Sequence, residues 1–432
     1  MKKILVVSHA HPDFSKGGGE VAAYNAYLGF REKYPQADVR FLAAVNYGVL
    51  PGKIVNYKPS EYLMGACVED NRFFRNHSTV LLKQSLEELT DDFEPELVNF
   101  HHYYNIGLDS IIMLRRLLPN AKFMMTLHEF LAICLNDGQM IKRNSTSLCT
   151  GSNEFLCGKC FPENDLSFFA KRKNSLLSVF SLFDQFISPS DFLLERYVAW
   201  GIPAGKIAMV ENGQLRDHAD PSDTEPTFKH DVFAQFLGTK QAPEDKRQPN
   251  VFGYFGQINP YKGLDVILMA LKQLLRIEVP NLVVEINGAN IETQKGEFRD
   301  RIQALADPLL EAGVLRWNGP YERAELPIRM KRIDWVLMPS VWWENSPMII
   351  QESYIYKKPV ICSNIGGMRE KVIHGKSGIH VSAGSVTEWA EVISKAAQAR
   401  TLREAMVESL PNPPTCQEMA ELYMRHIHGT GT

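Results

Sequence analysis

No apolar run in the sequence approaches the roughly 20 residues that a bilayer-spanning helix needs. The first apolar run, residues 4–7, ends at Ser8 before a polar stretch, which is typical of a buried first strand and not of a signal peptide. The net charge of −3 gives no reason to expect nucleic acid as a partner. Only seven cysteines occur, and without an export signal we expect them to be reduced. We therefore predict a cytoplasmic protein that does not bind nucleic acid.

The length of 432 residues is more than one hydrophobic core usually organises, so we expect two domains. Short apolar runs such as residues 4–7, 97–100 and 122–127 alternate with stretches of helical spacing, which is typical of a doubly wound parallel α/β sheet. A second series of strands begins at residues 251–256. Residues 215–250 lose this alternation and are polar, so we interpret them as a linker.

The most informative stretch is residues 342–352, which read WWENSPMIIQE. Ser346 is a good N-cap, and Pro347 suits the first helical position because its missing N–H would be unpaired there. The pattern therefore predicts a helix that begins at this point. The free N–H groups and the positive dipole end at its start form a ready site for a phosphate.

Two carboxylates flank this predicted phosphate site. Glu344 lies just before the cap, and Glu352 falls on the helix face that it shares with Asn345 and Met348. A pair of glutamates is more commonly a pair of solvated charges. Here one lies at the phosphate end and one further along the helix, which would suit the binding of a sugar and a ribose by one surface.

Two features lie at the carboxyl ends of the first strands. The sequence KGGGE at residues 16–20 follows the first strand as a loop and precedes a helical pattern, and its glycines would let the backbone approach a ligand closely. His128 follows the strand at residues 122–127 and should lie at the same edge. A histidine at a strand end is more commonly structural than catalytic, so its role depends on context.

Four cysteines fall within residues 134–160, and two of them form a C-x2-C pair: Cys134, Cys149, Cys157 and Cys160. Four thiolates in so short a segment favour a structural zinc ion. Buried or reactive free cysteines, an iron–sulfur cluster and a disulfide are the alternatives. A closed site of four thiolates has no open coordination position, so it would hold the loop and take no part in chemistry.

The spacing Glu344-x7-Glu352, with Asn-Ser-Pro between the two, resembles the signature of retaining GT-B glycosyltransferases of family 4, the glycosyl transferases group 1. The cysteine set after His128 is similar to that of one subgroup. The resemblance implies two doubly wound, Rossmann-like parallel-sheet domains facing a cleft. These would be an acceptor-side domain at 1–214 with a Cys-rich insert at 134–160, the linker at 215–250, a nucleotide-sugar-binding domain at 251–410, and a tail at 411–432 that crosses back to the first domain.

The same resemblance implies roles for residues of the first domain. His128 would contact the donor sugar and its diphosphate, as the histidine of the family's Thr-Leu-His-Asp segment does. Glu129 stands here in place of the aspartate, an exchange that keeps the negative charge. Gly18 and Gly19 would face the phosphates and the acceptor.

In the second domain, the resemblance implies that Lys262 neutralises the diphosphate, that Glu344 holds sugar hydroxyls and that Glu352 holds the ribose. Gln257 stands where the family has an arginine, and it can still donate hydrogen bonds. The implied catalytic residues are thus His128, Lys262 and Glu344, and the implied donor-binding residues are Gly18, Gly19, Gln257, Gly288, Tyr321, Asn345, Ser346, Pro347, Met348 and Glu352.

The implied reaction is transfer of a hexosyl-type group, with retention, from a nucleoside diphosphate sugar to an acceptor hydroxyl. No cofactor is required for catalysis. The acceptor would be a glycan or a lipid-linked molecule of surface polysaccharide synthesis, and a lipid-linked acceptor would bring the protein to the inner face of the membrane. A nucleotide-sugar 2-epimerase on the same fold and a non-catalytic sugar-nucleotide-binding subunit are the alternatives.

Overall fold

The computed structural model describes residues 1–15, 17–76, 79–143, 145, 147–216, 250–277, 279 and 282–429. The chain divides into two compact units: the first unit comprises Met1–Arg216 and Pro414–Thr432, and the second comprises Asp217–Pro413. Most of the predicted linker, residues 217–249, lies outside the described residues.

The first unit is built on an eight-stranded sheet within the described part of the chain, in the order β10-β9-β8-β7-β1-β2-β4-β3. All neighbours are parallel except β3 and β4. Its strands are β1 (Lys3–Ser8), β2 (Asp38–Val45), β3 (Ile54–Lys58), β4 (Glu61–Gly65), β7 (Leu97–Phe100), β8 (Lys122–Thr126), β9 (Gln185–Ser188) and β10 (Ile207–Met209), and a separate hairpin pairs β5 (Val68–Asp70) with β6 (Arg75–Asn76). The helices are α1 (Gly18–Lys33), α2 (Thr79–Asp92), α3 (Leu108–Leu117), α4 (Glu154–Cys160), α5 (Leu166–Phe180), α6 (Asp191–Trp200) and α15 (Cys416–His428).

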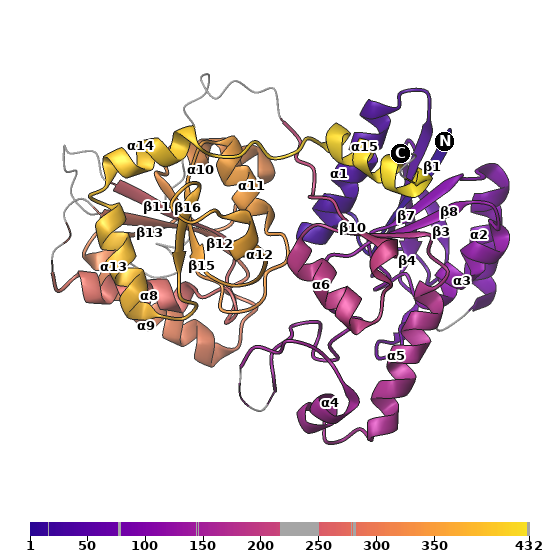
Figure 1. The fold of residues 1–432 in the computed structure, drawn as a ribbon, viewed down its shortest axis with the longest axis horizontal. Coiled ribbons are helices and arrows are strands. Elements are labelled where there is room, and N and C mark those ends of the chain that lie inside the picture. The colour runs from indigo at the N-terminus through magenta and orange to yellow at the C-terminus, as the bar shows by residue number, and fades with distance from the viewer. Residues whose placement is uncertain are drawn as a thin grey trace. The chain divides into compact units, whose positions relative to one another are not determined.

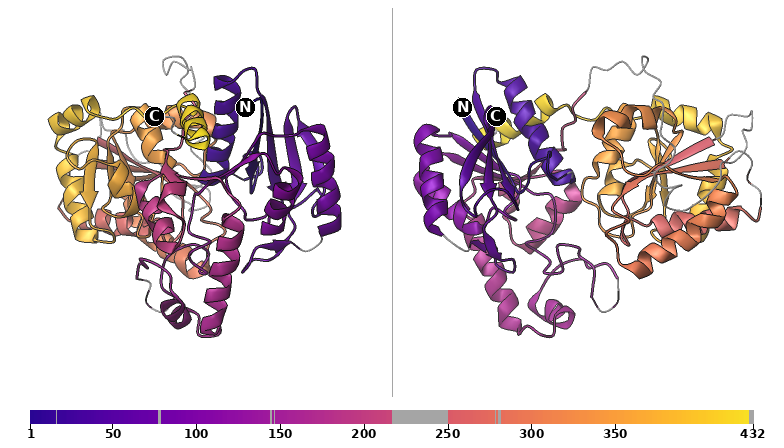
Figure 2. Two further views of the ribbon diagram at one scale, coloured as in Figure 1. Left: turned by 45° about the vertical axis from the view of Figure 1, so that its right-hand side comes forward. Right: turned by 180° about the vertical axis from the view of Figure 1, so that it is seen from behind.

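Helix α15 comes from the C-terminal end of the chain and packs against α1 (Figure 1). Figure 2 shows this pair from two further sides. Thr415 caps α15 in a reciprocal pair with Glu418, which satisfies N–H groups at its start. Lys33 on α1 donates to Glu421 on α15 at 2.5 Å. The last helix is therefore part of the first unit.

The second unit has a six-stranded sheet, again counted over the described residues, in the order β13-β12-β11-β14-β15-β16 with every neighbouring pair parallel. Its strands are β11 (Asn250–Gln257), β12 (Leu282–Ala289), β13 (Leu315–Trp317), β14 (Trp335–Met338), β15 (Val360–Ser363) and β16 (Gly378–Val381). The helices are α8 (Leu264–Leu274), α9 (Gly296–Glu311), α10 (Leu326–Lys331), α11 (Met348–Ile355), α12 (Gly366–Lys371), α13 (Val386–Ala396) and α14 (Arg400–Glu408).

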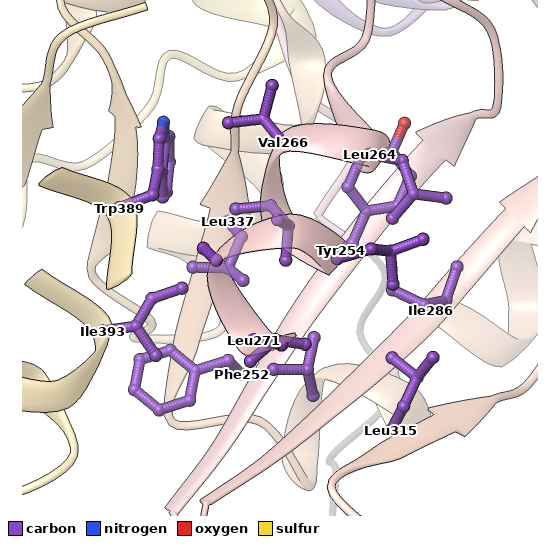
Figure 3. Close-up of a cluster of buried hydrophobic side chains, with 14 of the residues drawn as sticks. Phe252, Tyr254, Leu264, Val266, Leu271, Ile286, Leu315, Leu337, Trp389 and Ile393 are labelled. Carbon is purple, nitrogen blue, oxygen red and sulfur yellow. The ribbon is translucent and has the colours of Figure 1, made fainter. Parts of the chain in front are cut away.

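Alternate residues of β11 enter different cores because successive strand side chains point to opposite faces. Phe252 and Tyr254 pack with α8 and α13, where Trp389 is fully buried (Figure 3). Val251 and Phe255 pack on the other face, with α10, α11 and α12. Both faces are covered, so the apolar run at residues 251–256 forms a central strand. The predicted α/β class with two doubly wound, Rossmann-like parallel sheets is confirmed.

No helix among the described residues combines the length and the apolar character that crossing a membrane would require.

Candidate functional site

The second sheet reverses its winding between β11 and β14, which are hydrogen-bonded neighbours although β12 and β13 lie between them in the chain. Open parallel sheets bind ligands beyond the carboxyl ends of their strands at such a point. Lys262 lies in the loop after β11, and Glu344 lies in the loop after β14. The N–H of Val341 donates to the carbonyl of Tyr261 at 2.8 Å, which ties the two loops together. The fold thus brings Lys262 and Glu344, both predicted to be catalytic, to one place.

Glu344 is buried and accepts three hydrogen bonds on Oε1: from Lys262 Nζ at 2.6 Å, from Ser340 Oγ at 2.8 Å and from Trp342 Nε1 at 2.9 Å. Burial alone would raise the pKa of Glu344, but Lys262 and these hydrogen bonds bring it below its usual value. The indole of Trp342 stacks on Tyr261 with ring centroids 5.4 Å apart. The carboxylate and the ammonium are therefore an ionised pair that is fixed before any ligand binds.

Helix α11 begins at Met348, one residue later than predicted. Pro347 occupies the N-cap position and has no side-chain oxygen to offer, so the prediction that Ser346 is the N-cap was wrong. The fixed φ of proline fits either position, and helix ends are defined only to within a residue or two by local sequence. Asn345 and Ser346 still lead from Glu344 into the start of a helix.

Gly366 and Gly367, the first two residues of α12, shape the backbone at Glu344. The N–H of Gly367 donates to the carbonyl of Glu344 at 2.7 Å, and a Cβ on Gly367 would overlap the carbonyl oxygen of Asn345. Gly366 has a φ of +55°, which suits glycine.

Three further predicted donor-binding residues lie in the same unit. Burial raises the pKa of Glu352 on α11, and Arg323 opposes this rise. Burial, followed by the charge of Glu352, raises the pKa of Tyr321. Gly288 is the next-to-last residue of β12 and donates its N–H to the carbonyl of Gly319 at 3.1 Å. Gly288 thus lies at the carboxyl end of β12, and Tyr321 lies in the loop after β13.

A buried arginine joins the carboxyl end of β12 to the loop after β13. Arg329 on α10 donates to Asn287 Oδ1 at 3.0 Å and to the carbonyls of Gly319 at 3.1 Å and Pro320 at 2.9 Å. Asn318 donates to the same Asn287 oxygen at 3.2 Å. Sequence reasoning missed Arg329 because it opens the basic run RMKR at 329–332, a pattern that ordinarily predicts solvated charges.

Gln257, which stands where the related pattern has an arginine, is exposed at the end of β11. Its backbone carbonyl accepts a hydrogen bond from the hydroxyl of Tyr254 at 2.7 Å. The side chain is thus displayed at the edge of the sheet from which Lys262 also comes.

The first sheet reverses its winding at β1, which pairs with β2 on one side and β7 on the other. His9 follows β1, His101 and His102 follow β7, and His128 follows β8. A hydrogen bond of 2.9 Å joins His101 Nδ1 to His128 Nε2. Burial, followed by repulsion from His9, lowers the pKa of His128 to about 3, so its imidazole is neutral at pH 7.

Gly18 and Gly19 are the first residues of α1, so the prediction that they belong to a loop was wrong. A Cβ on Gly19 would lie 3.4 Å from His9 and 3.9 Å from His128, whereas a Cβ on Gly18 would meet nothing within 4 Å. Lys16 of the same stretch lies outside the described residues. The structure therefore brings Gly19, but not Gly18, against the predicted catalytic histidine.

Two carboxyl groups at this edge have opposite pKa shifts. Burial would raise the pKa of Glu20, but His9 at 3.5 Å and the Ser15 hydroxyl at 2.5 Å bring it to about 2. Burial raises the pKa of Glu129 to about 8, and its Oε1 lies 3.3 Å from His102 Nε2. This shift favours the protonated form of Glu129 near neutral pH over the negative charge that the sequence led us to expect.

The four predicted zinc ligands lie in and beside helix α4. Burial and then the other three thiols, Cys134, Cys149 and Cys160, raise the pKa of Cys157 to about 11. Cys149 Sγ donates to the carbonyl of Gly151 at 3.1 Å. Among the described residues, which include all four cysteines, no group of three or more His, Cys, Asp or Glu side chains is arranged to hold a metal ion. The thiols as placed do not form a zinc site, and the structural zinc stays a prediction.

Residues 239–411 match the family model described as "Glycosyl transferases group 1", a match that covers less than half of the chain. A D-inositol 3-phosphate glycosyltransferase of Corynebacterium jeikeium is 31% identical over 163 residues, which are 38% of this chain and 38% of that protein. A lipopolysaccharide 1,2-N-acetylglucosaminetransferase of Salmonella typhimurium is 27% identical over 200 residues, covering 45% of this chain and 48% of that protein. The chain thus matches less than half of the length of these two curated relatives.

Solved structures match over the whole chain. The structure of Anabaena HepE in complex with UDP has a TM-score of 0.65 at 15% identity and covers 99% of this chain and 100% of that chain. Sucrose-phosphate synthase from Thermosynechococcus elongatus has a TM-score of 0.68 at 15% identity, covering 99% and 98%. At such identities the likeness shows the fold alone, and that fold is GT-B.

Proposed function

We propose that the protein is a retaining glycosyltransferase that moves a hexosyl-type group from a nucleoside diphosphate sugar to an acceptor hydroxyl. The observation that carries this proposal is the Lys262–Glu344 pair, with Nζ and Oε1 2.6 Å apart, at the switch point of the second sheet. It lies within the residues that match the group 1 glycosyl transferases. The UDP bound by Anabaena HepE supports a nucleotide sugar as the donor.

The chemical demand of this reaction is to stabilise the negative charge that builds on the leaving diphosphate. An ammonium has three N–H donors, so Lys262 can keep its bond to Glu344 and still donate to a phosphate oxygen. The amides that lead into α11 would add further donors. We propose that Glu344 orients Lys262 and holds sugar hydroxyls, and that Glu352 holds the ribose.

The bond from the anomeric carbon to the diphosphate oxygen breaks, and a bond to the acceptor oxygen forms on the same face. The acceptor proton passes to the leaving diphosphate. On this proposal, His128 donates a hydrogen bond to the sugar or diphosphate, and no cofactor takes part. Tyr321 would border the base, in the loop after β13 that Arg329 holds in place, and Gly288 would contact the donor from the end of β12.

The proposed acceptor is a glycan or lipid-linked molecule of surface polysaccharide synthesis, bound on the side of the first unit. The lipopolysaccharide enzyme among the relatives supports this class. We also propose a cytoplasmic location, with membrane contact where the acceptor is lipid-linked.

The first test is calorimetry of the purified protein against UDP-, GDP-, ADP- and dTDP-sugars. We expect one nucleotide class to bind, and we expect Lys262→Ala and Glu352→Ala each to abolish or strongly weaken this binding. Lys395→Ala is the matched control, because Lys395 is an exposed lysine of α13 in the same unit that also pairs with a glutamate.

No binding by any of these donors, or binding that survives both substitutions, would refute the site. Tight donor binding without transfer to any acceptor or to water would favour a non-catalytic binding subunit. Release of free rearranged sugar in the absence of an acceptor would favour a 2-epimerase.

A further inference from the structure

Three polar side chains of the first sheet form a buried chain of hydrogen bonds that ends on His128. Asn99 and His101 lie on and just after β7, and His128 follows the neighbouring parallel strand β8. Asn99 Nδ2 lies 3.2 Å from His101 Nε2, and His101 Nδ1 lies 2.9 Å from His128 Nε2. Asn99 is fully buried and His101 is 1% exposed, so water does not compete for the bond between these two side chains.

Each link of this chain determines the direction of the next. The amide nitrogen of asparagine only donates, so His101 Nε2 must accept. Burial brings the pKa of His101 well below its usual value, so the ring is neutral and carries a single proton, which must then be on Nδ1. That N–H donates to His128 Nε2. Since His128 is neutral as well, its own proton must be on Nδ1.

The geometry of the two rings supports a directional bond between them. The planes of the His101 and His128 rings differ by 18°, and the lone pair of a ring nitrogen lies in the plane of its own ring. The N–H of His101 can therefore point nearly along the lone pair of His128 Nε2. The hydroxyl of Thr126 lies 3.3 Å from Asn99 Oδ1 and can donate to it, which is consistent with the amide nitrogen facing His101.

We propose that Asn99 and His101 are positioning residues that hold His128 as the tautomer with its proton on Nδ1, which makes that nitrogen a hydrogen-bond donor. The role of this donor rests on the proposed function: a phosphate or sugar oxygen accepts hydrogen bonds, and an imidazole nitrogen with a lone pair facing it would repel it. The tautomer itself does not rest on that function. Burial of three polar side chains in a parallel sheet is costly unless every bond is made, and here the satisfied chain also selects one proton arrangement.

The tautomer is measured directly by NMR on protein labelled with 15N at histidine, because a protonated and an unprotonated ring nitrogen differ widely in chemical shift. The chain has 12 histidines, and a His128→Gln variant identifies the signal of His128. We expect a protonated Nδ1 and an unprotonated Nε2 for His128 in the ligand-free protein at pH 7. Protonation on Nε2 would overturn the proposal.

The second arm removes the first link with Asn99→Leu, a substitution of similar volume. We expect the His128 tautomer to become mixed, and kcat to fall about tenfold with a smaller change in KM, as loss of one oriented hydrogen bond predicts. Asn25→Leu is the matched control, because Asn25 is also fully buried in the first unit and donates its amide N–H to the carbonyl of Gly213 at 2.8 Å. It should cost similar stability and leave the His128 tautomer unchanged.

An unchanged tautomer in Asn99→Leu would overturn the proposed control by Asn99. The two proposals fail separately: if no nucleotide sugar binds but His128 carries its proton on Nδ1, the proposed function is refuted and the hydrogen-bond chain stands. If donors bind and His128 carries its proton on Nε2, the function stands and the chain is refuted.

Discussion

The carboxyl edges of the two sheets are built on the same plan and carry different kinds of chemistry. The edge of the first sheet presents three neutral imidazoles near the ionised Glu20, since burial brings the pKa values of His101, His102 and His128 below their usual range. The edge of the second sheet presents an ionised pair, Lys262 and Glu344. Both edges are half-buried or buried, so burial by itself does not decide whether a group is charged.

The difference lies in the partners. Glu344 keeps its charge because an ammonium, a hydroxyl and an indole N–H all donate to one oxygen. His101 and His128 are each other's partners, and two imidazoles side by side cannot both be charged at low cost. The first edge is thus suited to directional hydrogen bonds, and the second edge is suited to binding a negatively charged group through Lys262.

The largest effect is expected from Lys262→Met, which removes the positive charge of the ion pair at the second edge. We expect kcat for sugar transfer to fall by about 10²–10³, the usual cost of losing one preorganised donor to a developing anion. The variant also leaves the Glu344 carboxylate unpaired, so its pKa should rise.

A double variant, Lys262→Met with Glu344→Gln, separates the two consequences of that change. Thermal unfolding should show that the double variant regains stability relative to Lys262→Met, while kcat stays low. Recovery of kcat in the double variant would contradict a direct role for Lys262.

A smaller effect is expected from Gly367→Ala, which keeps every charge and alters only the backbone that supports the pair. The added methyl group would overlap the carbonyl of Asn345, and overpacking of this kind costs about 1–3 kcal/mol. We expect lower thermal stability and weaker donor binding by calorimetry. Gly296→Ala at the start of α9 is the control, since its Cβ would meet no atom closer than 4.0 Å, and it should be neutral or slightly stabilising.

The two edges should differ in how their stability changes at mildly acidic pH. A neutral histidine whose folded pKa is below its unfolded value stabilises the fold above pH 6.5 and loses this contribution as the pH falls, which for His128 extends to about pH 3. Glu344, with a lowered pKa, loses its contribution only as the pH falls below its ordinary value of 4.5. Glu129 opposes the first trend between its ordinary 4.5 and about pH 8, but it is one carboxyl against three imidazoles.

We therefore expect amide exchange, corrected for the intrinsic effect of pH, to rise by about tenfold near β7 and β8 between pH 7 and pH 5, with little change near β14. The variant His128→Gln should show a smaller rise. Equal loosening of both edges would contradict the assignment of neutral histidines to the first.

The smallest effect is expected from chelators. Because neither edge depends on a bound metal in the proposed reaction, treatment with EDTA should leave kcat unchanged within about twofold, in line with a closed thiolate site having no catalytic position. Elemental analysis of the purified protein decides the separate zinc prediction. About one zinc per chain, lost in a Cys157→Ser variant, would support it, and absence of zinc would refute it.

Much of the fold could be predicted from local patterns. Apolar runs that alternate with helical spacing predicted parallel doubly wound sheets, and the run at residues 251–256 forms the central strand β11. The same patterns placed His128 just after a strand, because parallel strands deliver the residues that follow them to one edge, and they placed Glu344 just before a helix. The start of α11 was misplaced by one residue, since Ser346 and Pro347 both have good helix-start chemistry and local energies barely distinguish them.

By itself, the sequence determined that His128 lies at a strand end and Glu344 near the start of a helix, and tertiary structure alone decided which residues meet. Lys262 and Glu344 are 82 residues apart and pair only because β14 enters the sheet beside β11. His101 reaches His128 because β7 and β8 are neighbours, and Arg329 is buried because α10 brings it under two loops. Strand order and burial result from packing between residues that are far apart in the sequence. They decide which groups become partners, and the partners decide which groups at the two edges are charged.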